Sequence, residues 1–194
     1  MDQRQAEEIF KKSGAFLQGH FLLTSGLHSP GYLQCALVCQ DPAVCAQLCA
    51  ELAKPFRGAG VNAVIGPAMG GIVLAYEMAR ALGVRGLFTE RDENGRMVLR
   101  RGFALERGEK VLVAEDVMTT GGSAAELIEV AAAAGVEVVG VVALVDRGGA
   151  ARFEGRRVAY ALKVELPTYQ PAECPLCRQG AQLTKPGSRK RPGT

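Results

Sequence analysis

The sequence predicts an α/β fold in which a central parallel sheet is flanked by helices. Three observations lead to this class. Expected strands and helices alternate along the chain, the strands are almost wholly apolar, and a loop rich in glycine, charge or hydroxyl groups follows each strand. Apolar strands are typical of parallel sheets that helices cover on both faces. Ligands of such sheets bind beyond the carboxyl ends of the strands, so these loops are where we expect a site.

The N-terminal part of the chain is expected to form two helices separated by a turn-rich segment. An amphipathic helix is predicted over residues 5–16, and residues 19–35 then place turn formers around two short apolar runs. The second helix opens at Asp41-Pro42. Asp41 has the side chain of a helix N-cap, and Pro42 suits the first helical position.

The rest of the chain predicts the sheet and its covering helices. Helices are expected over residues 71–82 and 123–134, and a charged loop over residues 90–102 is expected to turn at its Glu-Asn-Gly triplet. The tail from residue 167 onward is rich in proline, glycine and basic residues, so we expect it to be irregular. Four strands are predicted, over residues 61–65, 85–89, 111–114 and 136–145.

The composition is that of an ordinary globular protein. Hydrophobic residues make up 48% and charged residues 22% of the 194 residues, and this length makes one domain the default. The net charge of +3 is too small to argue for binding to nucleic acid or to a membrane. The polar N-terminus does not resemble a signal peptide, and no apolar run reaches the roughly 20 residues that span a bilayer. We therefore expect a cytoplasmic protein whose six cysteines are mainly thiols.

The stretch VLVAEDVMTTGGS, residues 111–123, carries the strongest functional signal. Its last five residues, 119–123, lie between an expected strand and an expected helix. Amides at a helix N-terminus and small hydroxyl side chains suit a phosphate, and the glycines permit close backbone approach. The segment is not a nucleoside-triphosphate P-loop, because no Gly-Lys-Ser/Thr sequence follows.

Two carboxylates, Glu115 and Asp116, directly precede this loop. A phosphate alone does not explain them, but a sugar phosphate does. Carboxylates accept hydrogen bonds from vicinal ribose hydroxyls while the loop holds the 5-phosphate, and their charge stabilises a ribose carbon that becomes cationic as its glycosidic bond loosens. The alternative is that the acids only end a strand and that the loop only caps a helix.

These motifs resemble those of a known enzyme family. VLVAEDVMTTGGS resembles the phosphoribosyl pyrophosphate signature of the type I phosphoribosyltransferases: four apolar residues, an acidic pair, and a Thr/Gly/Ser loop. HFLLTSGLHSPGYLQ is similar to the N-terminal segment of orotate phosphoribosyltransferases, with its F-x-L-x-SG-x-x-S-x-x-Y arrangement. In ALVDRGG, Arg147 stands where that family contacts orotate. With GPAMGG the resemblance spans about residues 20–150, and the tail looks like that of a subgroup found in thermophilic bacteria.

The resemblance implies a type I phosphoribosyltransferase fold over residues 1–194, with a core at about 41–149 and a small hood from about 15–40 and 150–185. The implied reaction transfers ribose 5-phosphate from phosphoribosyl pyrophosphate to orotate, giving orotidine 5′-phosphate and pyrophosphate in pyrimidine biosynthesis. Mg²⁺ would be bound through the substrate, with Asp116 as the candidate protein ligand. The resemblance also implies a homodimer whose flexible loop is shared across subunits, and no nucleic-acid or membrane partner.

The resemblance also implies roles for individual residues. Glu115 and Asp116 would be catalytic. The loop over residues 90–102 would close over the pyrophosphate, although it also reads as a solvated charged β-hairpin. The residues expected to bind phosphoribosyl pyrophosphate are Glu115, Asp116, Val117, Met118, Thr119, Thr120, Gly121, Gly122, Ser123, Met69, Gly70, Arg91 and Arg101. The residues expected to bind orotate are Ser25, Gly26, Tyr32, Thr119 and Arg147.

Some features depart from the family pattern and keep other functions open. Thr24 and Gly70 stand where many of these enzymes have lysines, and the 90–102 loop is arginine-based without a histidine. Arg147 also reads as a surface arginine after a strand. One alternative function is transfer to a purine base. Another is a phosphoribosyl-pyrophosphate-sensing regulator that binds nucleic acid, which the small net charge disfavours.

Cys174-Pro-Leu-Cys177 has the spacing of half a zinc site. Tetrahedral zinc needs four ligands, and the candidates for the other two are Cys35, Cys39, Cys45 and Cys49. Cys45 and Cys49 share one face of an expected helix, where small buried thiols are the ordinary interpretation. His20 and His28 are interpreted as exposed or hydrogen-bonded turn histidines. No zinc is therefore expected, with Cys174 and Cys177 as weak candidates.

Overall fold

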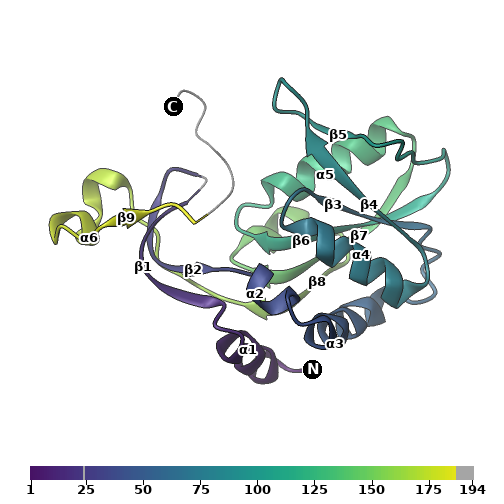
Figure 1. The fold of residues 1–194 in the computed structure, drawn as a ribbon. Coiled ribbons are helices and arrows are strands. Elements are labelled where there is room, and N and C mark those ends of the chain that lie inside the picture. Colours follow the sequence, from purple (N-terminus) through teal and green to yellow (C-terminus); the bar gives the residue numbers. More distant parts are fainter. Residues whose placement is uncertain (24, 187–194) are drawn as a thin grey trace.

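A computed structural model describes residues 1–23 and 25–186 of the chain (Figure 1). Thr24 and the basic C-terminal ending lie outside the described residues. The body of the molecule is a six-stranded sheet in the order β5-β4-β3-β6-β7-β8, parallel except for β5, which pairs antiparallel with β4. The predicted α/β class is confirmed. The strands are β3 (Ala63–Pro67), β4 (Arg85–Arg91), β5 (Met97–Leu99), β6 (Lys110–Met118), β7 (Glu137–Asp146) and β8 (Val158–Lys163).

Helices cover both faces of this sheet, as predicted. Helices α3 (Pro42–Ala53) and α4 (Gly71–Leu82) lie on one face, and α5 (Gly122–Ala133) lies on the other (Figure 1). Alternate residues of one strand belong to the two separate cores. Leu112 of β6 packs in the core beneath α3 and α4, whereas Val113 packs in the core beneath α5. This period of two explains why the strands are apolar throughout.

The helix starts follow their local signals. The Asp41 carboxylate accepts hydrogen bonds from the amides of Ala43 and Val44, at 2.9 and 3.3 Å, and Pro42 occupies the first turn of α3. Both expectations for this helix are confirmed. Helix α4 has the predicted bounds, and Gly83 ends it in the left-handed conformation at φ 71°, which glycine adopts without a steric cost.

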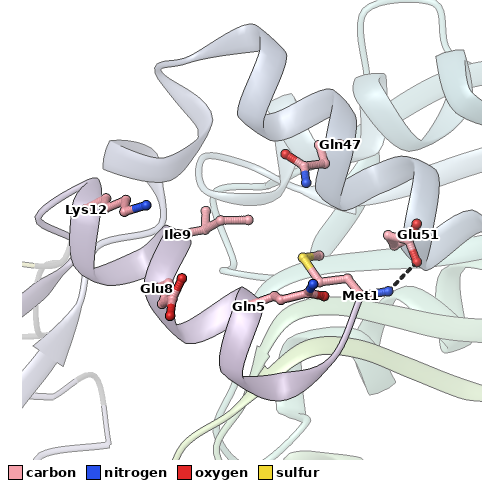
Figure 2. Close-up of a pocket in the computed structure, with 7 residues that line it drawn as sticks. All are labelled: Met1, Gln5, Glu8, Ile9, Lys12, Gln47 and Glu51. Atoms are coloured by element: carbon pink, nitrogen blue, oxygen red, sulfur yellow. Dashed lines mark hydrogen bonds and ion pairs between the residues drawn. The ribbon is translucent and has the colours of Figure 1, made fainter.

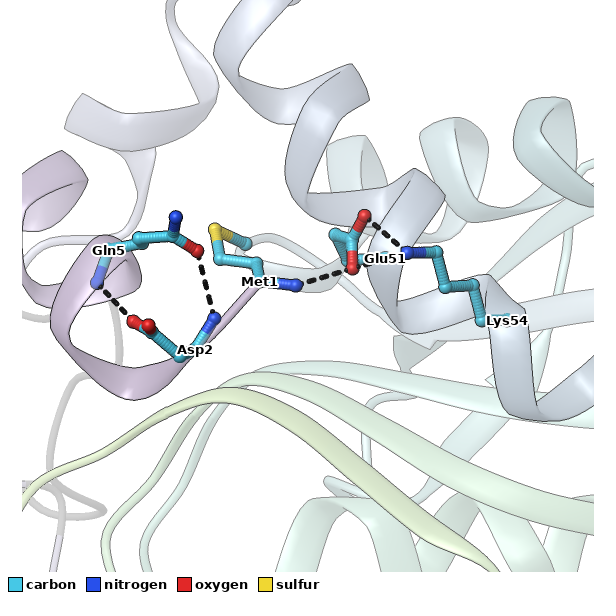
Figure 3. Close-up of polar contacts among 5 residues, drawn as sticks. All are labelled: Met1, Asp2, Gln5, Glu51 and Lys54. Carbon is cyan, nitrogen blue, oxygen red and sulfur yellow. Dashed lines mark hydrogen bonds and ion pairs between the residues drawn. The ribbon is translucent and has the colours of Figure 1, made fainter.

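The N-terminal helix α1 (Gln3–Lys12) is fastened to α3 (Figure 3). Asp2 and Gln5 form a capping box, with bonds of 2.8 and 3.0 Å between each side chain and the other residue's amide. The N-terminal ammonium donates to Glu51 of α3 at 2.6 Å. The helix ends earlier than predicted, because Gly14 at φ 70° breaks it and Phe16 begins a strand.

A second, small sheet stands beside the body, to its left in Figure 1. It consists of β1 (Phe16–Leu22), β2 (His28–Leu33) and β9 (Leu183–Thr184), in the order β2-β1-β9. The tail after residue 166 was predicted to be irregular, but it forms short elements against this sheet. The remaining short helices are α2 (Ala36–Cys39), α6 (Pro175–Arg178), and the 3₁₀ helices η1 (Lys54–Phe56), η2 (Gly149–Phe153) and η3 (Pro171–Glu173).

A hollow of about 320 Å³ lies between α1 and α3 (Figure 2). None of the residues expected to bind substrate lines it, so it is separate from the candidate site. The hollow is lined by Met1, Gln5, Glu8, Ile9, Lys12, Gln47 and Glu51.

No helix within residues 1–23 and 25–186 is both long and apolar enough to cross a membrane.

Candidate active site

Three of the loops singled out from the sequence meet at one edge of the sheet. They follow β3, β6 and β7, which are neighbouring parallel strands, so their carboxyl ends lie side by side. The amide of Arg147, after β7, donates to the carbonyl of Met118, at the end of β6, at 2.8 Å. This hydrogen bond ties the loop that carries Arg147 to the loop that carries the expected phosphate site.

The acidic pair lies inside β6 rather than after it. The predicted strand stops at Ala114, but pairing with β7 continues to Met118. Consecutive residues of a strand point to opposite faces, so the two carboxylates leave β6 in different directions. Glu115 is buried, with 7% of its surface exposed, and Asp116 is half-buried. An oxygen of the Asp116 carboxylate accepts the amide of Val117 at 2.9 Å.

The turn after β3 passes directly beside Asp116. A Cβ atom added at Gly70 would lie 2.2 Å from Oδ2 of Asp116, which is far inside van der Waals contact. At Gly71 an added Cβ would lie 2.4 Å from Cδ of Pro67. An alanine at Gly71 would collide with the Pro67 ring, whereas an alanine at Gly70 would displace the Asp116 carboxylate.

We expect Gly70→Ala to lower kcat/KM by about 100-fold, because Asp116 is expected to be catalytic and displacing such a group by about 1 Å has an effect of that size. The added methyl group must push the Asp116 carboxylate aside. The thermal unfolding temperature should change little, since the flexible end of one side chain can move. Steady-state kinetics and a thermal melt, measured on the same preparation, check both expectations.

A double-mutant cycle shows whether this loss passes through Asp116. In an Asp116→Ala background there is no carboxylate to displace, so adding Gly70→Ala should then have little further effect. Losses that simply add would contradict the assignment. They would mean that the turn after β3 is damaged independently of the acid.

Two helix N-termini open at this edge, one on each side of the acidic pair. Within the described residues, no side chain caps α4, which begins at the turn after β3, or α5, which begins at the loop after β6. Thr119 and Thr120 of that loop are exposed, and Gly121 adopts φ 70° against the ring of Phe153. Uncapped amides at a helix N-terminus attract anions, so the edge offers two anion sites flanking two carboxylates.

The pKa shifts of Tyr32 and Arg147 indicate that these two side chains lie close together. Burial raises the pKa of the Tyr32 phenol, and the charges of Asp116 and Cys35 raise it further, whereas Arg147 lowers it. Burial lowers the pKa of the Arg147 guanidinium, and Tyr32 opposes that shift. Tyr32 is therefore close enough to interact with the charges of both Asp116 and Arg147. Arg147 is half-buried, which favours a role in a pocket over that of an ordinary surface arginine.

Ser25 and Gly26 lie farther along the same hairpin. They form the turn between β1 and β2, where Gly26 adopts φ 85°, and the Ser25 hydroxyl accepts the amide of Leu27 at 3.5 Å. Tyr32 lies near the opposite end of β2. The structure thus separates these expected orotate contacts along one strand.

Sequence reasoning missed Asp146, which holds the loop of Arg147 in shape. Its carboxylate is 2% exposed and accepts the amides of Gly148 and Ala150, at 3.1 and 2.9 Å. An aspartate directly before a glycine-rich turn is the available signal, because Asp side chains organise such turns by bonding to amides two or more residues ahead. Asp146 is a positioning residue for Arg147.

The two arginines expected to reach phosphate are paired with glutamates. Arg91 contacts Glu126 of α5 through two bonds of 2.9 and 3.0 Å, which raise the pKa of its guanidinium. Arg101 contacts Glu90 at 2.7 and 2.9 Å. The predicted turn at residues 93–95 is confirmed, since β4 and β5 form an antiparallel hairpin around it. Phosphate binding by this loop stays a prediction.

Comparisons with known proteins show the family to which the chain belongs. The profile of the phosphoribosyl transferase domain matches residues 42–164. An orotate phosphoribosyltransferase of Desulforamulus reducens is 57% identical over 98% of this chain and 99% of its own length, and one of Pelotomaculum thermopropionicum is 55% identical over 98% and 100%. The crystal structure of orotate phosphoribosyltransferase from Aeropyrum pernix is 32% identical, with a TM-score of 0.68 over 81% of this chain and 92% of that one. The chain therefore belongs to the orotate phosphoribosyltransferase family.

Proposed function

We propose that the chain transfers ribose 5-phosphate from phosphoribosyl pyrophosphate to orotate and releases pyrophosphate. The observation that carries this proposal is the pair of uncapped helix N-termini on either side of Glu115 and Asp116. A phosphorylated sugar with a second phosphate group on its reacting carbon fits two anion sites separated by carboxylates. The named relatives, more than half identical over nearly the full chain, favour orotate over a purine base.

Each loop at this edge of the sheet is assigned to bind a different part of the substrates. The loop of residues 119–123 and the amides of α5 would hold the 5-phosphate, and the turn of residues 66–71 with the amides of α4 would hold the pyrophosphate. Glu115 and Asp116 would accept the ribose hydroxyls and stabilise positive charge that develops at the ribose carbon. Arg147, fixed by Asp146, would bind the orotate anion from the neighbouring loop.

The residues present also fit a magnesium ion carried by the substrate. The Asp116 carboxylate offers a hard oxygen ligand beside the turn expected to hold pyrophosphate. Within the described residues the acidic pair is not part of any larger cluster of metal-ligating side chains, which fits a metal held mainly by substrate oxygens and water. When bound there, Mg²⁺ would neutralise charge on the pyrophosphate leaving group.

The hairpin of β4 and β5 would close over the bound pyrophosphate. Closure would exclude water, which could otherwise hydrolyse the activated sugar. Arg91 and Arg101 would then exchange their present glutamate partners for phosphate oxygens. Both ion pairs are at least partly exposed, so releasing them has a small free-energy cost.

We also propose that the chain forms a homodimer through α4 and the turn before it, and that the hairpin loop is shared across the subunits. Met69, Val73 and Tyr76 are 70%, 49% and 68% exposed, which is unusual for large apolar side chains so close together. Val73→Asp combined with Tyr76→Asp should halve the mass measured by analytical ultracentrifugation. Ala132→Asp, at an exposed position of α5, should leave it unchanged. A wild-type chain that sediments as a monomer would exclude the dimer.

The activity is tested by following the absorbance of orotate in the presence of Mg²⁺ and phosphoribosyl pyrophosphate. Orotate should be consumed only when all components are present, and adenine or xanthine should not replace it. Turnover of a purine base without turnover of orotate would favour the purine alternative. Salt-sensitive RNA or DNA binding without any turnover would favour the regulator.

We propose a cytoplasmic location, which the six free cysteines support.

A further inference from the structure

We propose that the small sheet holds a structural zinc ion bound by His20, His28, Cys174 and Cys177. One ligand atom from each of these four residues lies within 4.8 Å of all the others. The sequence pattern alone indicates only two ligands, Cys174 and Cys177, and therefore predicts no zinc. The structure supplies the other two from histidines of the β1–β2 hairpin, not from the cysteines of residues 35–49.

Four of the distances between the ligand atoms are close to those of a tetrahedral site, and the four atoms all lie within 4.8 Å of one another. Nε2 of His20 lies 2.9 Å from Nδ1 of His28, 3.4 Å from the Cys174 sulfur and 3.7 Å from the Cys177 sulfur. The Cys177 sulfur lies 3.3 Å from Nδ1 of His28. Zinc at its usual bond lengths separates such ligands by about 3.3 to 3.8 Å. Shifts of a few tenths of an ångström would therefore bring the His20–His28 pair to the separation that zinc requires.

A backbone carbonyl holds the His20 ring in the form that a metal requires. Nδ1–H of His20 donates to the carbonyl of Ala181 at 2.9 Å, so its Nε2 carries a lone pair. That lone pair points at the other three ligand atoms. A metal-bound histidine ordinarily donates its second ring N–H in this way, which fixes both the tautomer and the ring orientation.

Burial of the cluster differs from what the sequence suggested for the two histidines. His20 and His28 are 4% and 5% exposed and lie in strands, and Cys174 is wholly buried. Only Cys177 reaches the surface. Burying two imidazoles and a thiol in so small a sheet costs free energy unless their polar atoms are bound. One open side would let the metal enter.

The segment of residues 167–186 has almost no other source of stability. Within these described residues only Cys174 is buried, and β9 is two residues long. The segment is attached to the hairpin mainly by polar contacts, among them the backbone pairing of Tyr169 with His28 and the bond from Ser29 to the Pro167 carbonyl. A unit without a core usually needs a metal or a disulfide to fold.

The donor set selects zinc among the common metals. Two imidazoles and two thiolates in a tetrahedral arrangement are a frequent structural zinc set, whereas magnesium and calcium prefer oxygen ligands. All four positions come from the protein, so the site is closed and serves structure rather than chemistry. Its role would be to anchor residues 167–186 against β2, the strand that carries Tyr32.

The test is the metal content of the full chain, purified without chelator and measured by mass spectrometry of the elements. We expect about one zinc per chain, as for other closed four-ligand sites. Cys174→Ser and His20→Asn should each lose the metal, whereas Cys39→Ser, which changes a thiol on α2 outside the cluster, should retain it. Wild-type content in Cys174→Ser would overturn the site, and so would a reduced wild-type chain that takes up no zinc.

Two further measurements keep the proposal testable if a variant fails to fold. Wild-type chain loaded with Co²⁺ should show the strong visible absorption of a tetrahedral thiolate site, and a weak octahedral spectrum would overturn it. Stripping zinc from the wild-type chain should open residues 167–186 to proteolysis, and adding zinc back should close them. A disulfide between Cys174 and Cys177 in freshly purified chain, found by peptide mass, would assign the cluster to a redox pair instead.

Discussion

Asp116→Asn is expected to lower kcat by about 100-fold or more, in the range found when one electrostatic contact to a transition state is removed. The substitution keeps the shape of the side chain and its acceptor for the Val117 amide, but it removes the negative charge. Charge matters most when the ribose carbon is cationic, and that state exists only on the way to product. The dissociation constant of phosphoribosyl pyrophosphate should therefore change much less than kcat.

The comparison of these two quantities is what makes the variant informative. Single-turnover kinetics give the chemical rate, and calorimetric titration gives the dissociation constant. Asp41→Asn is the matched control, because it makes the same chemical change at the N-cap of α3, where asparagine caps as well as aspartate. Equal losses of rate and of affinity in Asp116→Asn would contradict a charge-stabilising role and leave Asp116 as a binding residue.

Arg147→Ala is expected to raise the KM for orotate by about 10- to 100-fold, the effect of losing a hydrogen bond to a charged group. Arg147 is half-buried between Tyr32 and the end of β6, so its guanidinium is already partly dehydrated. The KM for phosphoribosyl pyrophosphate should change far less, since its phosphates are assigned to other loops. Steady-state kinetics with each substrate varied in turn provide the measurement.

Arg152→Ala serves as the control for Arg147→Ala. Arg152 lies five residues along the same connection, in η2, but its side chain is exposed. Its removal takes away one positive charge near the site without touching the proposed pocket. An unchanged orotate KM in Arg147→Ala would remove Arg147 from the pocket, and an equal rise in both variants would show that only general charge attraction is involved.

The helices of the body could be predicted because their signals are local. Asp41 and Pro42 determine the start of α3 through contacts within one turn. Helix α4 begins at a glycine pair and ends at Gly83, so both bounds could be read from neighbouring residues. The class of the fold followed from apolar strands, whose two faces are both buried.

The extent of β6 could not be predicted from local signals. Two carboxylates after Ala114 look like a loop, yet pairing of Glu115 with Ala143 and of Val117 with Val145 carries the strand to Met118. This tertiary pairing outweighs the local preference. It also puts the acids on a rigid strand rather than on a loop, which holds their carboxylates in fixed directions.

The contacts that complete the candidate site and the metal cluster also lie beyond sequence reasoning. The approach of Gly70 to Asp116 depends on how the turn after β3 packs against β6. His20 and Cys177 are 157 residues apart in sequence, and nothing in the local pattern joins them. Two of the four proposed zinc ligands could be recognised in the sequence from the spacing Cys-x-x-Cys. The other two are histidines of the β1–β2 hairpin, which look like ordinary turn residues in the sequence.

The most direct test of the proposed site is a crystal structure with phosphoribosyl pyrophosphate and Mg²⁺ bound. The account predicts the 5-phosphate on the amides of residues 119–123, the ribose hydroxyls within hydrogen-bond distance of the acidic pair, and the pyrophosphate against the turn that contains Gly70. A donor whose ribose lies away from Glu115 and Asp116, with its phosphates on neither helix N-terminus, would contradict it.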